Sequence, residues 1–255
     1  MKISKILVAN RSEIAIRVFR AANELGIKTV AIWAEEDKLS LHRFKADESY
    51  QVGRGPHLAK DMGPIESYLS IEEGIRVAKL SGADAIHPGY GLLSESPEFV
   101  EACNKAGITF IGPTADTMRQ LGNKVAARNL AISVDVPVVP ATNPLPDDIA
   151  EVERMAEEIG YPVMLKASWG GGGRGMRAIR KKEDLAPEGT EAKREAKAAF
   201  GKDEVYLEKL VERARHVESQ ILGDTHGNVV HLFERDCSIQ RRNQKVVERA
   251  PAPYL

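Results

Sequence analysis

The first 113 residues alternate between short apolar runs and amphipathic helical segments, and this alternation strongly limits the folds open to the chain. The run at residues 3–9 predicts a buried strand, and apolar residues at helical spacing over residues 14–25 predict the helix that follows. A second strand is expected at residues 28–33. Strands that alternate with helices in this way form a parallel sheet, so residues 1–113 are predicted to be a doubly wound α/β domain.

Two helix starts in this domain carry local capping signals. Ser70 followed by Glu73 forms a capping-box pattern at the start of a helix that runs toward Leu80. Ser96 precedes Pro97, which suits the first position of a helix because an N–H there would have no partner. Each helix is expected to lead into a further strand, at residues 84–87 and 108–111.

The pattern changes after Pro113. A helix is expected over about residues 115–130, and residues 146–200 hold two helical segments around a strand–glycine–strand unit. From Val205 onward the pattern predicts antiparallel strands, joined by a turn at residues 223–228. The second part of the chain is therefore predicted to be of mixed α+β type.

The composition excludes several classes of protein. With 43% hydrophobic and 29% charged residues, the chain is neither disordered nor fibrous, and no apolar stretch is long enough to span a membrane. The 36 basic and 37 acidic side chains leave a net charge of −1, which argues against a nucleic-acid binder. Cys103 and Cys237 are too far apart to indicate a disulfide or zinc framework, and the short apolar run at the N-terminus is not a secretory signal. A cytoplasmic location is therefore expected.

The first strand-to-helix turn contains no glycine. Residues 9–13 read ANRSE, whereas a dinucleotide fold places glycines there so that a pyrophosphate can approach the backbone. A nicotinamide cofactor is therefore disfavoured. Glu35 matches a ribose-binding acid by its position after the second strand, but without the glycines it is expected to be a solvated carboxylate.

A glycine-rich stretch lies at residues 170–175, which read GGGGRG. Met176 stands where a Walker loop would have lysine, and residues 176–179 read as a strand where a Rossmann turn would need a helix. The stretch is therefore expected to be a hairpin tip whose backbone N–H groups suit a lid over phosphates. Lys166, just upstream, favours phosphate over the alternative of a plain mobile loop.

Three further segments contain candidate binding residues, each with a simpler alternative. Lys124 could contact phosphate or be an ordinary surface lysine. Residues 208–211 (EKLV) could bind an adenine edge through their backbone, or simply expose a solvated Glu–Lys pair. Residues 240–245 (QRRNQK) carry three cations, which suit a small anion such as phosphate or bicarbonate, or else a charged edge strand that resists aggregation.

Four stretches together resemble the biotin carboxylase family, the ATP-grasp enzymes or domains that begin biotin-dependent carboxylases. They are residues 6–15 (ILVANRSEIA), residues 87–91 (HPGYG), residues 166–169 with the glycines that follow, and residues 234–242 (ERDCSIQRR). They occur in the family's order along the whole chain. Within the family, the chain looks most like the N-terminal part of the bacterial pyruvate carboxylase branch.

The resemblance implies a division of the chain into four parts. Residues 1–113 would form the pre-ATP-grasp domain, and residues 114–135 the linking helix that opens the ATP-grasp domain. Residues 136–204 would be the α+β lid, and residues 205–255 the start of an antiparallel central sheet. The expected fold is therefore a doubly wound α/β domain followed by an incomplete ATP-grasp domain.

The resemblance also implies roles for individual residues. ATP binding is implied for Lys124, Lys166, Gly171, Gly172, Gly173, Met176, Glu208, Lys209, Val211, His216, Gln240 and Asn243. Catalytic positions beside bicarbonate and the terminal phosphate are implied for Gln240, Arg242 and Lys245. The implied ligase reaction uses MgATP to phosphorylate bicarbonate to carboxyphosphate, from which a biotin held on a carrier domain is carboxylated.

Three positions depart from the family's pattern. Asn243 stands where many members have histidine, which leaves a neutral hydrogen bond in place of a charged role. Ser12 replaces a glycine of the first turn, which suggests that this turn tolerates a Cβ. Pro187 and Gly189 fall within a lid helix of the family, and because both residues break helices, the helix is expected to restart near Thr190.

The family's Mg²⁺-binding carboxylates, catalytic base and biotin-stabilising arginine are expected beyond the position that matches Leu255. No metal ligand is therefore expected here, Glu218 and Glu234 are not assigned to those roles, and the chain alone is expected to be inactive. The implied partners are bicarbonate, a biotinylated carrier domain, a carboxyltransferase domain and further copies of the full-length protein, with neither nucleic acid nor membrane. The alternatives are an acetyl-CoA or propionyl-CoA carboxylase, a carbamoyl-phosphate synthetase-like ligase, and a non-catalytic nucleotide-binding fragment.

Overall fold

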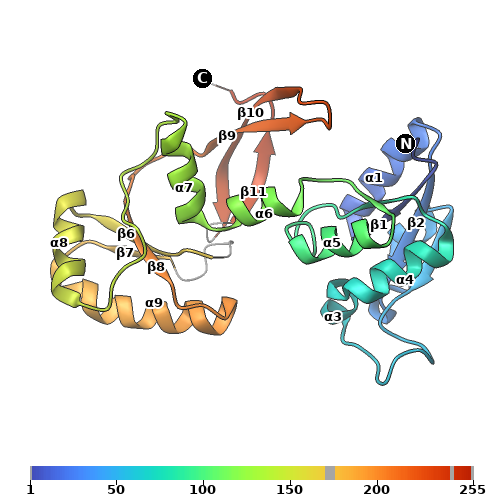
Figure 1. Ribbon diagram of the computed structural model, residues 1–255, viewed down its shortest axis with the longest axis horizontal. Helices are drawn as coiled ribbons and strands as arrows, with labels where there is room; N and C mark the ends of the chain where they lie inside the picture. The colour runs from blue at the N-terminus through green and yellow to red at the C-terminus, as the bar shows by residue number, and fades with distance from the viewer. Residues whose placement is uncertain (1, 170–175, 242–243, 254–255) are drawn as a thin grey trace. The chain divides into compact units, whose positions relative to one another are not determined.

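The computed structural model describes residues 2–169, 176–241 and 244–253, and it divides the chain into two compact units, Met1–Leu121 and Gly122–Leu255 (Figure 1). The predictions for Gly171, Gly172, Gly173, Arg242 and Asn243 lie outside the described residues.

The first unit is built on a parallel sheet. Its five strands are β1 (Lys5–Val8), β2 (Lys28–Trp33), β3 (Glu48–Gln51), β4 (Ala85–His87) and β5 (Thr109–Phe110). They lie in the order β3-β2-β1-β4-β5, and every pairing is parallel. This confirms the predicted doubly wound sheet, in which the strand order reverses between β1 and β4.

Helices cover both faces of this sheet. They are α1 (Ser12–Glu24), η1 (Glu35–Asp37), α2 (Leu41–Lys45), α3 (Pro64–Leu69), α4 (Ile71–Ser81) and α5 (Pro97–Lys105). Alternate residues of β1 enter different cores: Ile6 and Val8 pack with Phe19 of α1, whereas Leu7 packs with Phe99 of α5. The predicted caps are confirmed, because Ser70 Oγ accepts from Glu73 N (3.2 Å) and Ser96 Oγ accepts from Phe99 N (3.1 Å).

The single helix expected over residues 115–130 is two helices, α6 (Ala115–Gly122) and α7 (Lys124–Ser133). The break is at Asn123, whose side chain caps α7 by accepting from Ala126 N (2.9 Å). The backbone of Asn123 also forms a bridge with Trp169, far along the chain. The prediction was wrong because helical periodicity continues across a residue that tertiary pairing takes out of the helix.

Residues 149–209 contain a three-stranded sheet flanked by helices. Helix α8 (Ile149–Ile159) precedes strands β6 (Val163–Ala167) and β7 (Arg177–Ile179), and η2 (Lys182–Asp184) and α9 (Leu185–Phe200) lead to β8 (Val205–Lys209). The strands lie in the antiparallel order β7-β6-β8, so β8 belongs to the same sheet as the predicted strand–glycine–strand unit.

Helix α9 does not restart near Thr190, and the expected break at Pro187 and Gly189 is wrong. Pro187 lies in the first turn of α9, where backbone N–H groups have no partner within the helix and a proline removes no hydrogen bond. Gly189 costs an α-helix only about 1 kcal/mol relative to alanine, which the packing of the apolar face of α9 outweighs.

The chain ends in a second antiparallel sheet. Its strands are β9 (Val217–Gly223), β10 (Val229–Arg241) and β11 (Gln244–Arg249), in the order β11-β10-β9. The predicted turn at residues 223–228 joins β9 to β10, and Asp224 closes it by accepting from Asn228 N (2.9 Å). Most residues of these strands are exposed, including apolar Ile239 and Val246.

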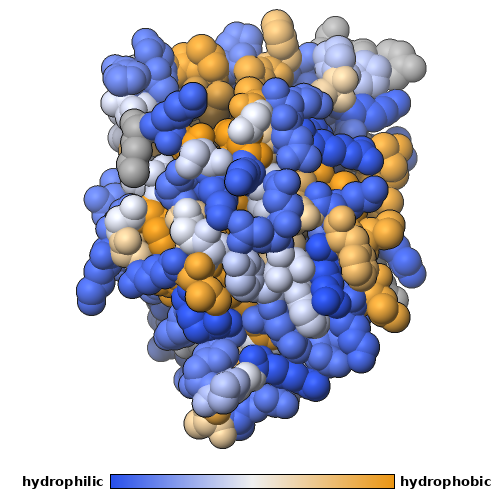
Figure 2. All heavy atoms as spheres, turned by 90° about the vertical axis from the view of Figure 1, so that its right-hand side faces the viewer, coloured by the Kyte–Doolittle hydropathy of each residue, from blue (hydrophilic) through white to orange (hydrophobic). Residues whose placement is uncertain are grey.

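On the face drawn in Figure 2, hydrophilic side chains surround separate apolar patches. Cys103 and Cys237 are both buried and free. No helix in the described ranges combines the length and the apolar character that a membrane span needs.

Candidate functional site

Two of the motif stretches meet in the first unit. The buried Asn10 side chain donates to the carbonyls of Pro88 (2.8 Å) and Tyr90 (2.9 Å), which ties the turn after β1 to the turn after β4. Gly89 lies between them with φ +66°, and a Cβ there would be 2.7 Å from Asn10 Nδ2. The two motifs are therefore one packed structural unit at the carboxyl ends of β1 and β4.

Glu35, which the sequence suggested to be a solvated carboxylate, accepts from Lys38 (3.0 Å) and Gln51 (2.9 Å). The hydrogen bond from Lys38 lowers the pKa of Glu35. Both partners are side chains of the first unit, so Glu35 links η1 to β3 at the surface.

Two of the predicted ATP-binding lysines lie at one end of strand β6. The backbone N–H of Lys124 donates to the Ser168 carbonyl (3.0 Å), and Lys166 lies two residues earlier on β6. Lys124 is also the first residue of α7, where the helix dipole adds partial positive charge, although the N–H groups of Lys124 and Ala126 already donate to Ser168 and Asn123. The lysine charge and the dipole together are what this end of α7 offers to a phosphate.

Lys166 forms an ion pair with Glu208 across strands β6 and β8. Their side chains are 20% and 22% exposed, so the pair is accessible from one side. Tyr206 donates to the other oxygen of Glu208 (3.3 Å), and burial raises the pKa of the Tyr206 hydroxyl well above its usual range. A nucleotide phosphate could compete with Glu208 for the Lys166 ammonium.

The remaining predicted residues of this region have other surroundings. The Lys209 ammonium donates to the carbonyls of Gly160 (2.7 Å) and Tyr161 (3.2 Å), beyond the end of α8. Val211 is exposed, and Met176 is partly buried beside the start of β7. Lys209 therefore fixes the start of β6, and its side chain is engaged with the protein itself.

The second group of predicted residues meets on the sheet β9–β10–β11. We call Glu218 and the four residues around it, His216, Arg235, Gln240 and Lys245, the Glu218 network. One carboxylate oxygen of Glu218 accepts from Lys245 of β11, and the other accepts from Arg235 of β10. His216 Nε2 lies 3.9 Å from the oxygen that Lys245 contacts.

Gln240 holds His216 in this network. Its amide donates to His216 Nδ1 (2.9 Å) and to the Cys237 carbonyl (3.0 Å). The structure thus brings His216, which the resemblance implied as a nucleotide contact, together with Gln240 and Lys245, which it implied beside bicarbonate, although they lie up to 29 positions apart (216 to 245).

The charges in this network keep Glu218 ionised. The hydrogen bond from Lys245 is the main cause that lowers the pKa of Glu218, and the charge of Arg235 acts in the same direction. A carboxylate at this point holds the Lys245 ammonium in place while leaving the side chain one-third exposed, at 33%. Such an ammonium is available to an anion of small size.

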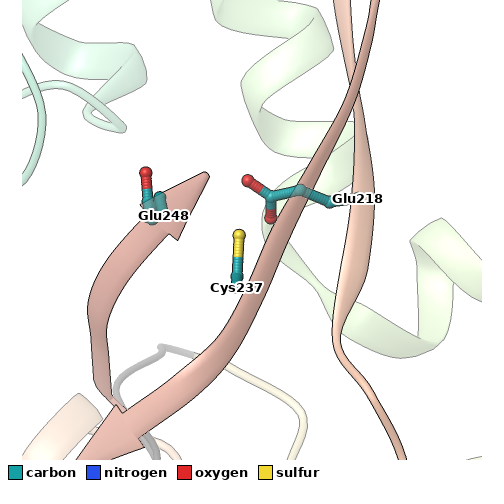
Figure 3. A group of neighbouring side chains, drawn as sticks. All are labelled: Glu218, Cys237 and Glu248. Carbon is teal, nitrogen blue, oxygen red and sulfur yellow. The ribbon is translucent and has the colours of Figure 1, made fainter. Parts of the chain in front are cut away.

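One group of side chains combines the residue types and the spacing of a metal site. It consists of Glu218, Cys237 and Glu248, whose ligand atoms lie within 4.8 Å of one another (Figure 3). Each comes from a different strand of the sheet, and both carboxylates already bind the Arg235 guanidinium. Mg²⁺ prefers an octahedron of oxygen ligands, and here it would meet a thiol and two cations. These residues do not fit Mg²⁺, and the described part of the chain offers no other candidate group.

Sequence reasoning missed Glu218 and Arg235 as site residues. Next to the turn, Val229 pairs with Gly223 and His231 pairs with Ile221. If this register continued along both strands, Glu218 would lie opposite Glu234. A β-bulge between His231 and Glu234 shifts the register by one residue, so that Glu218 pairs with Arg235 instead. The only signal in the sequence was the unfavourable pairing of two glutamates that an unbroken hairpin would create.

Comparisons with known proteins agree with this organisation. A model of the biotin carboxylase N-terminal domain matches residues 2–118, and a model of the carbamoyl-phosphate synthase L chain ATP-binding domain matches residues 123–255. The chain is 54% identical to a pyruvate carboxylase from Staphylococcus aureus, over 100% of this chain and 22% of the relative.

Solved structures give the same result. A variant of Rhizobium etli pyruvate carboxylase with its allosteric activator, acetyl coenzyme A, matches with 89% identity and a TM-score of 0.93, covering 100% of this chain and 22% of that one. The biotin carboxylase domain of Hydrogenobacter thermophilus 2-oxoglutarate carboxylase matches with 47% identity and a TM-score of 0.92, over 100% of this chain and 55% of that one.

The fold and the two domain matches define a doubly wound domain followed by an ATP-binding domain of the ATP-grasp type. The chain belongs to the biotin carboxylase family. It spans about a fifth of the length of the curated pyruvate carboxylases that it matches.

Proposed function

We propose that this chain is the ATP- and bicarbonate-binding part of a biotin carboxylase, an ATP-dependent ligase that carboxylates biotin on a carrier domain. The observation that carries the proposal is the Glu218 network, in which Lys245 and Arg235 bind the two oxygens of one carboxylate while Gln240 holds His216 3.9 Å from it. Such a cluster of donors suits an anion that receives a phosphoryl group.

Phosphoryl transfer from ATP to bicarbonate brings two anions together, and positively charged side chains must offset their repulsion. We assign the phosphates of the nucleotide to Lys124 and Lys166, which lie near each other at the end of β6. We assign bicarbonate and the transferred phosphate to Lys245 and Gln240, which pair across β10 and β11. MgATP supplies the phosphoryl group for carboxyphosphate, whose breakdown provides the carboxyl group for biotin, and no step is assigned to a metal ligand of this chain.

The known structures support the nucleotide and the anion. The Hydrogenobacter thermophilus domain is described in complex with MgADP, ADP and bicarbonate, and it shares this fold over the whole chain. We extend these ligands to the present chain. The four-part division into residues 1–113, 114–135, 136–204 and 205–255 is proposed as the matching domain organisation.

The final carboxyl acceptor is proposed to be pyruvate. The Rhizobium etli pyruvate carboxylase is 89% identical over this chain, against 47% for the 2-oxoglutarate carboxylase domain. The corresponding partners are a biotinylated carrier domain, a carboxyltransferase domain and further copies of the full-length protein. The cytoplasmic location stays a prediction.

The test is bicarbonate-dependent hydrolysis of ATP, with and without free biotin. It is measured on the 255-residue chain and on a chimera in which the chain replaces the matching segment of the Rhizobium etli enzyme. We expect activity in the chimera that both bicarbonate and biotin increase, and none in the chain alone. Hydrolysis in the chimera that bicarbonate increases but biotin does not would favour a ligase of the carbamoyl-phosphate synthetase type.

Lys166→Ala tests the nucleotide site within the same chimera. Removing the ammonium is expected to raise the KM for ATP at least several-fold, since one charge-assisted contact to phosphate is worth about 1.5–3 kcal/mol. Lys182→Ala is the matched control, because Lys182 pairs with Glu157 on the exposed face of α8. Equal KM values for ATP in the two variants would remove Lys166 from the phosphate site.

A further inference from the structure

Arg235 contacts carboxylates on both strands that neighbour its own. Its guanidinium donates to Glu218 on β9 and to Glu248 on β11 (2.5 Å), so one side chain of β10 joins all three strands of the sheet. The side chains of Arg235, Glu218 and Glu248 are 32%, 24% and 37% exposed. Figure 3 shows both carboxylates with Cys237 on the strand between them.

The backbone is shaped to bring Arg235 to this place. The bulge between His231 and Glu234 shifts the pairing of β10 with β9 by one residue, and Phe233 within it adopts φ +61°. A positive φ is unfavourable for a residue with a bulky side chain, so the bulge has an energetic cost. What it gains is the direct pairing of Arg235 with Glu218 in place of two facing glutamates.

Arg235 and Lys245 divide the two oxygens of Glu218 between them. Oε1 accepts from Arg235, and Oε2 accepts from Lys245 and faces His216. A carboxylate on a flexible glutamate can rotate, and either oxygen could then meet either cation. With Oε1 fixed by a guanidinium that is itself held by Glu248, only Oε2 remains for Lys245.

We propose that Arg235 is a positioning residue that acts through Glu218: it locks the carboxylate so that Lys245 is held toward the transferred phosphate. This inference rests on the proposed function of the site. Arg235 itself touches neither ATP nor bicarbonate in this scheme. Its guanidinium fork suits the task because it can bind two carboxylates at once, which the single ammonium of a lysine does less well.

The experiment compares Arg235→Gln, Arg235→Lys and unchanged protein in the chimera, by the pH dependence of kcat for bicarbonate-dependent ATP hydrolysis. For Arg235→Gln we expect kcat to fall about tenfold or more, with little change in the KM for ATP, because a loosened catalytic group costs rate rather than nucleotide binding. Arg235→Lys should restore part of the lost rate.

The acidic limb of the pH profile gives a readout that a merely structural residue would not move. Lys245, Arg235, His216, Cys237 and Glu248 surround Glu218, and the charge of Arg235 is one of the causes that lower its pKa. Arg235→Gln removes that cause. Protonation of Glu218 should then begin at a higher pH, and the acidic limb should move in that direction.

Arg249→Gln is the matched control. Arg249 lies on β11 and donates to the buried Asp236 of β10 (2.9 Å). It therefore joins β10 and β11, as Arg235 does through Glu248, but it does not contact Glu218. We expect this variant to leave the acidic limb in place. The inference is overturned if Arg235→Gln and Arg249→Gln give the same kcat and the same pH profile.

Two further measurements separate a failure to fold, and a failure of the proposed function, from a failure of this inference. If Arg235→Gln does not fold by circular dichroism, Arg235→Lys carries the test, because lysine keeps the charge but not the fork, and a kcat equal to that of the unchanged protein would overturn the inference. If the unchanged chimera shows no bicarbonate-dependent hydrolysis, the proposed function itself fails and this inference fails with it. Loss in the Arg235 variants alone, with a working parent, supports both.

Discussion

The parallel sheet of the first unit and the sheet β9–β10–β11 of the second unit are stabilised in different ways. In the first, Leu7, Val8 and Ile86 are 0% exposed, and helices cover both faces. In the second, Ile239 is 51% exposed and Val246 is 61% exposed, while ion pairs join neighbouring strands. Apolar burial positions residues in the first sheet, and charge pairing positions them in the second.

Carboxylates in the two units differ in the same way. Asp37 is buried and accepts from Arg11, Tyr68 and Ser40, and the hydrogen bond from Arg11 holds the pKa of Asp37 well below its usual range. Glu218 is about a quarter exposed, and one of the two cations bound to it is Lys245. A buried carboxylate such as Asp37 fixes the fold, even though its partner Arg11 is 45% exposed, whereas a carboxylate at the surface leaves its lysine available for a ligand.

The largest expected effect compares two isoleucines on strands. Ile86→Ala removes a side chain that is 0% exposed on β4 and should lower the free energy of unfolding by about 2–5 kcal/mol. Ile239→Ala removes one that is 51% exposed on β10 and should change it by about 0.5 kcal/mol or less. Urea denaturation followed by circular dichroism measures both. Equal losses would mean that the second sheet also depends on apolar burial.

Two glycines of the HPGYG motif give the next largest effect. Gly89→Ala and Gly91→Ala both place a Cβ at positive φ, +66° and +63°, which costs about 1–2 kcal/mol each. Only at Gly89 would the Cβ also meet Asn10 Nδ2, at 2.7 Å, and so disturb the link between the two motifs. We expect Gly89→Ala to be the more destabilising by about 1 kcal/mol or more in thermal unfolding. A smaller loss at Gly89 than at Gly91 would contradict this.

What the sequence predicted well was local. The caps at Ser70 and Ser96 depend on residues three positions apart, and strands β1, β2 and β4 on short runs that burial makes mostly apolar. The break at Asn123 was not predictable in this way, because its cause is a bridge to Trp169, 46 residues away (169 minus 123). Short elements such as α2 and β3 also carried too few residues for a periodic signal.

The candidate site shows the same limit. His216, Gln240 and Lys245 were named by resemblance, but the carboxylate that joins them depends on the strand register. A single bulge decides whether Glu218 faces Arg235 or Glu234, and the alternation of residue types on β9 and β10 is compatible with either register. The continuous α9 was missed for a different reason, since a rule against proline in helices does not hold in the first turn.

A third prediction concerns pH, and it contrasts a buried with an exposed histidine. His42 is 0% exposed, and burial lowers its pKa, opposed by the charge of Asp37 and assisted by that of Arg11. The unfolded chain therefore binds a proton that the folded chain does not, so acidification favours unfolding. Stability should fall as the pH drops below about 6.5, by at most about 1.4 kcal/mol per pH unit for this one group.

His42→Gln should flatten the dependence of the urea midpoint on pH between about 7 and 5. The exposed His226, in the turn between β9 and β10, provides the control, and His226→Gln should leave the slope unchanged. The same slope in both variants would mean that other groups of the chain account for the acid sensitivity.

The smallest expected effect compares two residues that carry a side chain at positive φ, one in each unit. Ser12 adopts φ +56° as the first residue of α1, and Asp135 adopts φ +59° after α7. Aspartate enters this region more readily than serine, because its carboxylate can bond nearby backbone groups. Glycine relieves the steric cost at either position but loses more entropy on folding, by about 0.5–1 kcal/mol. Ser12→Gly should therefore stabilise the chain slightly, and Asp135→Gly should not. The midpoint of thermal unfolding measures both changes. The reverse order would show that contacts of the first turn hold Ser12 and offset its strain. Polar groups, rather than apolar burial alone, would then position this turn, as they position the Glu218 network.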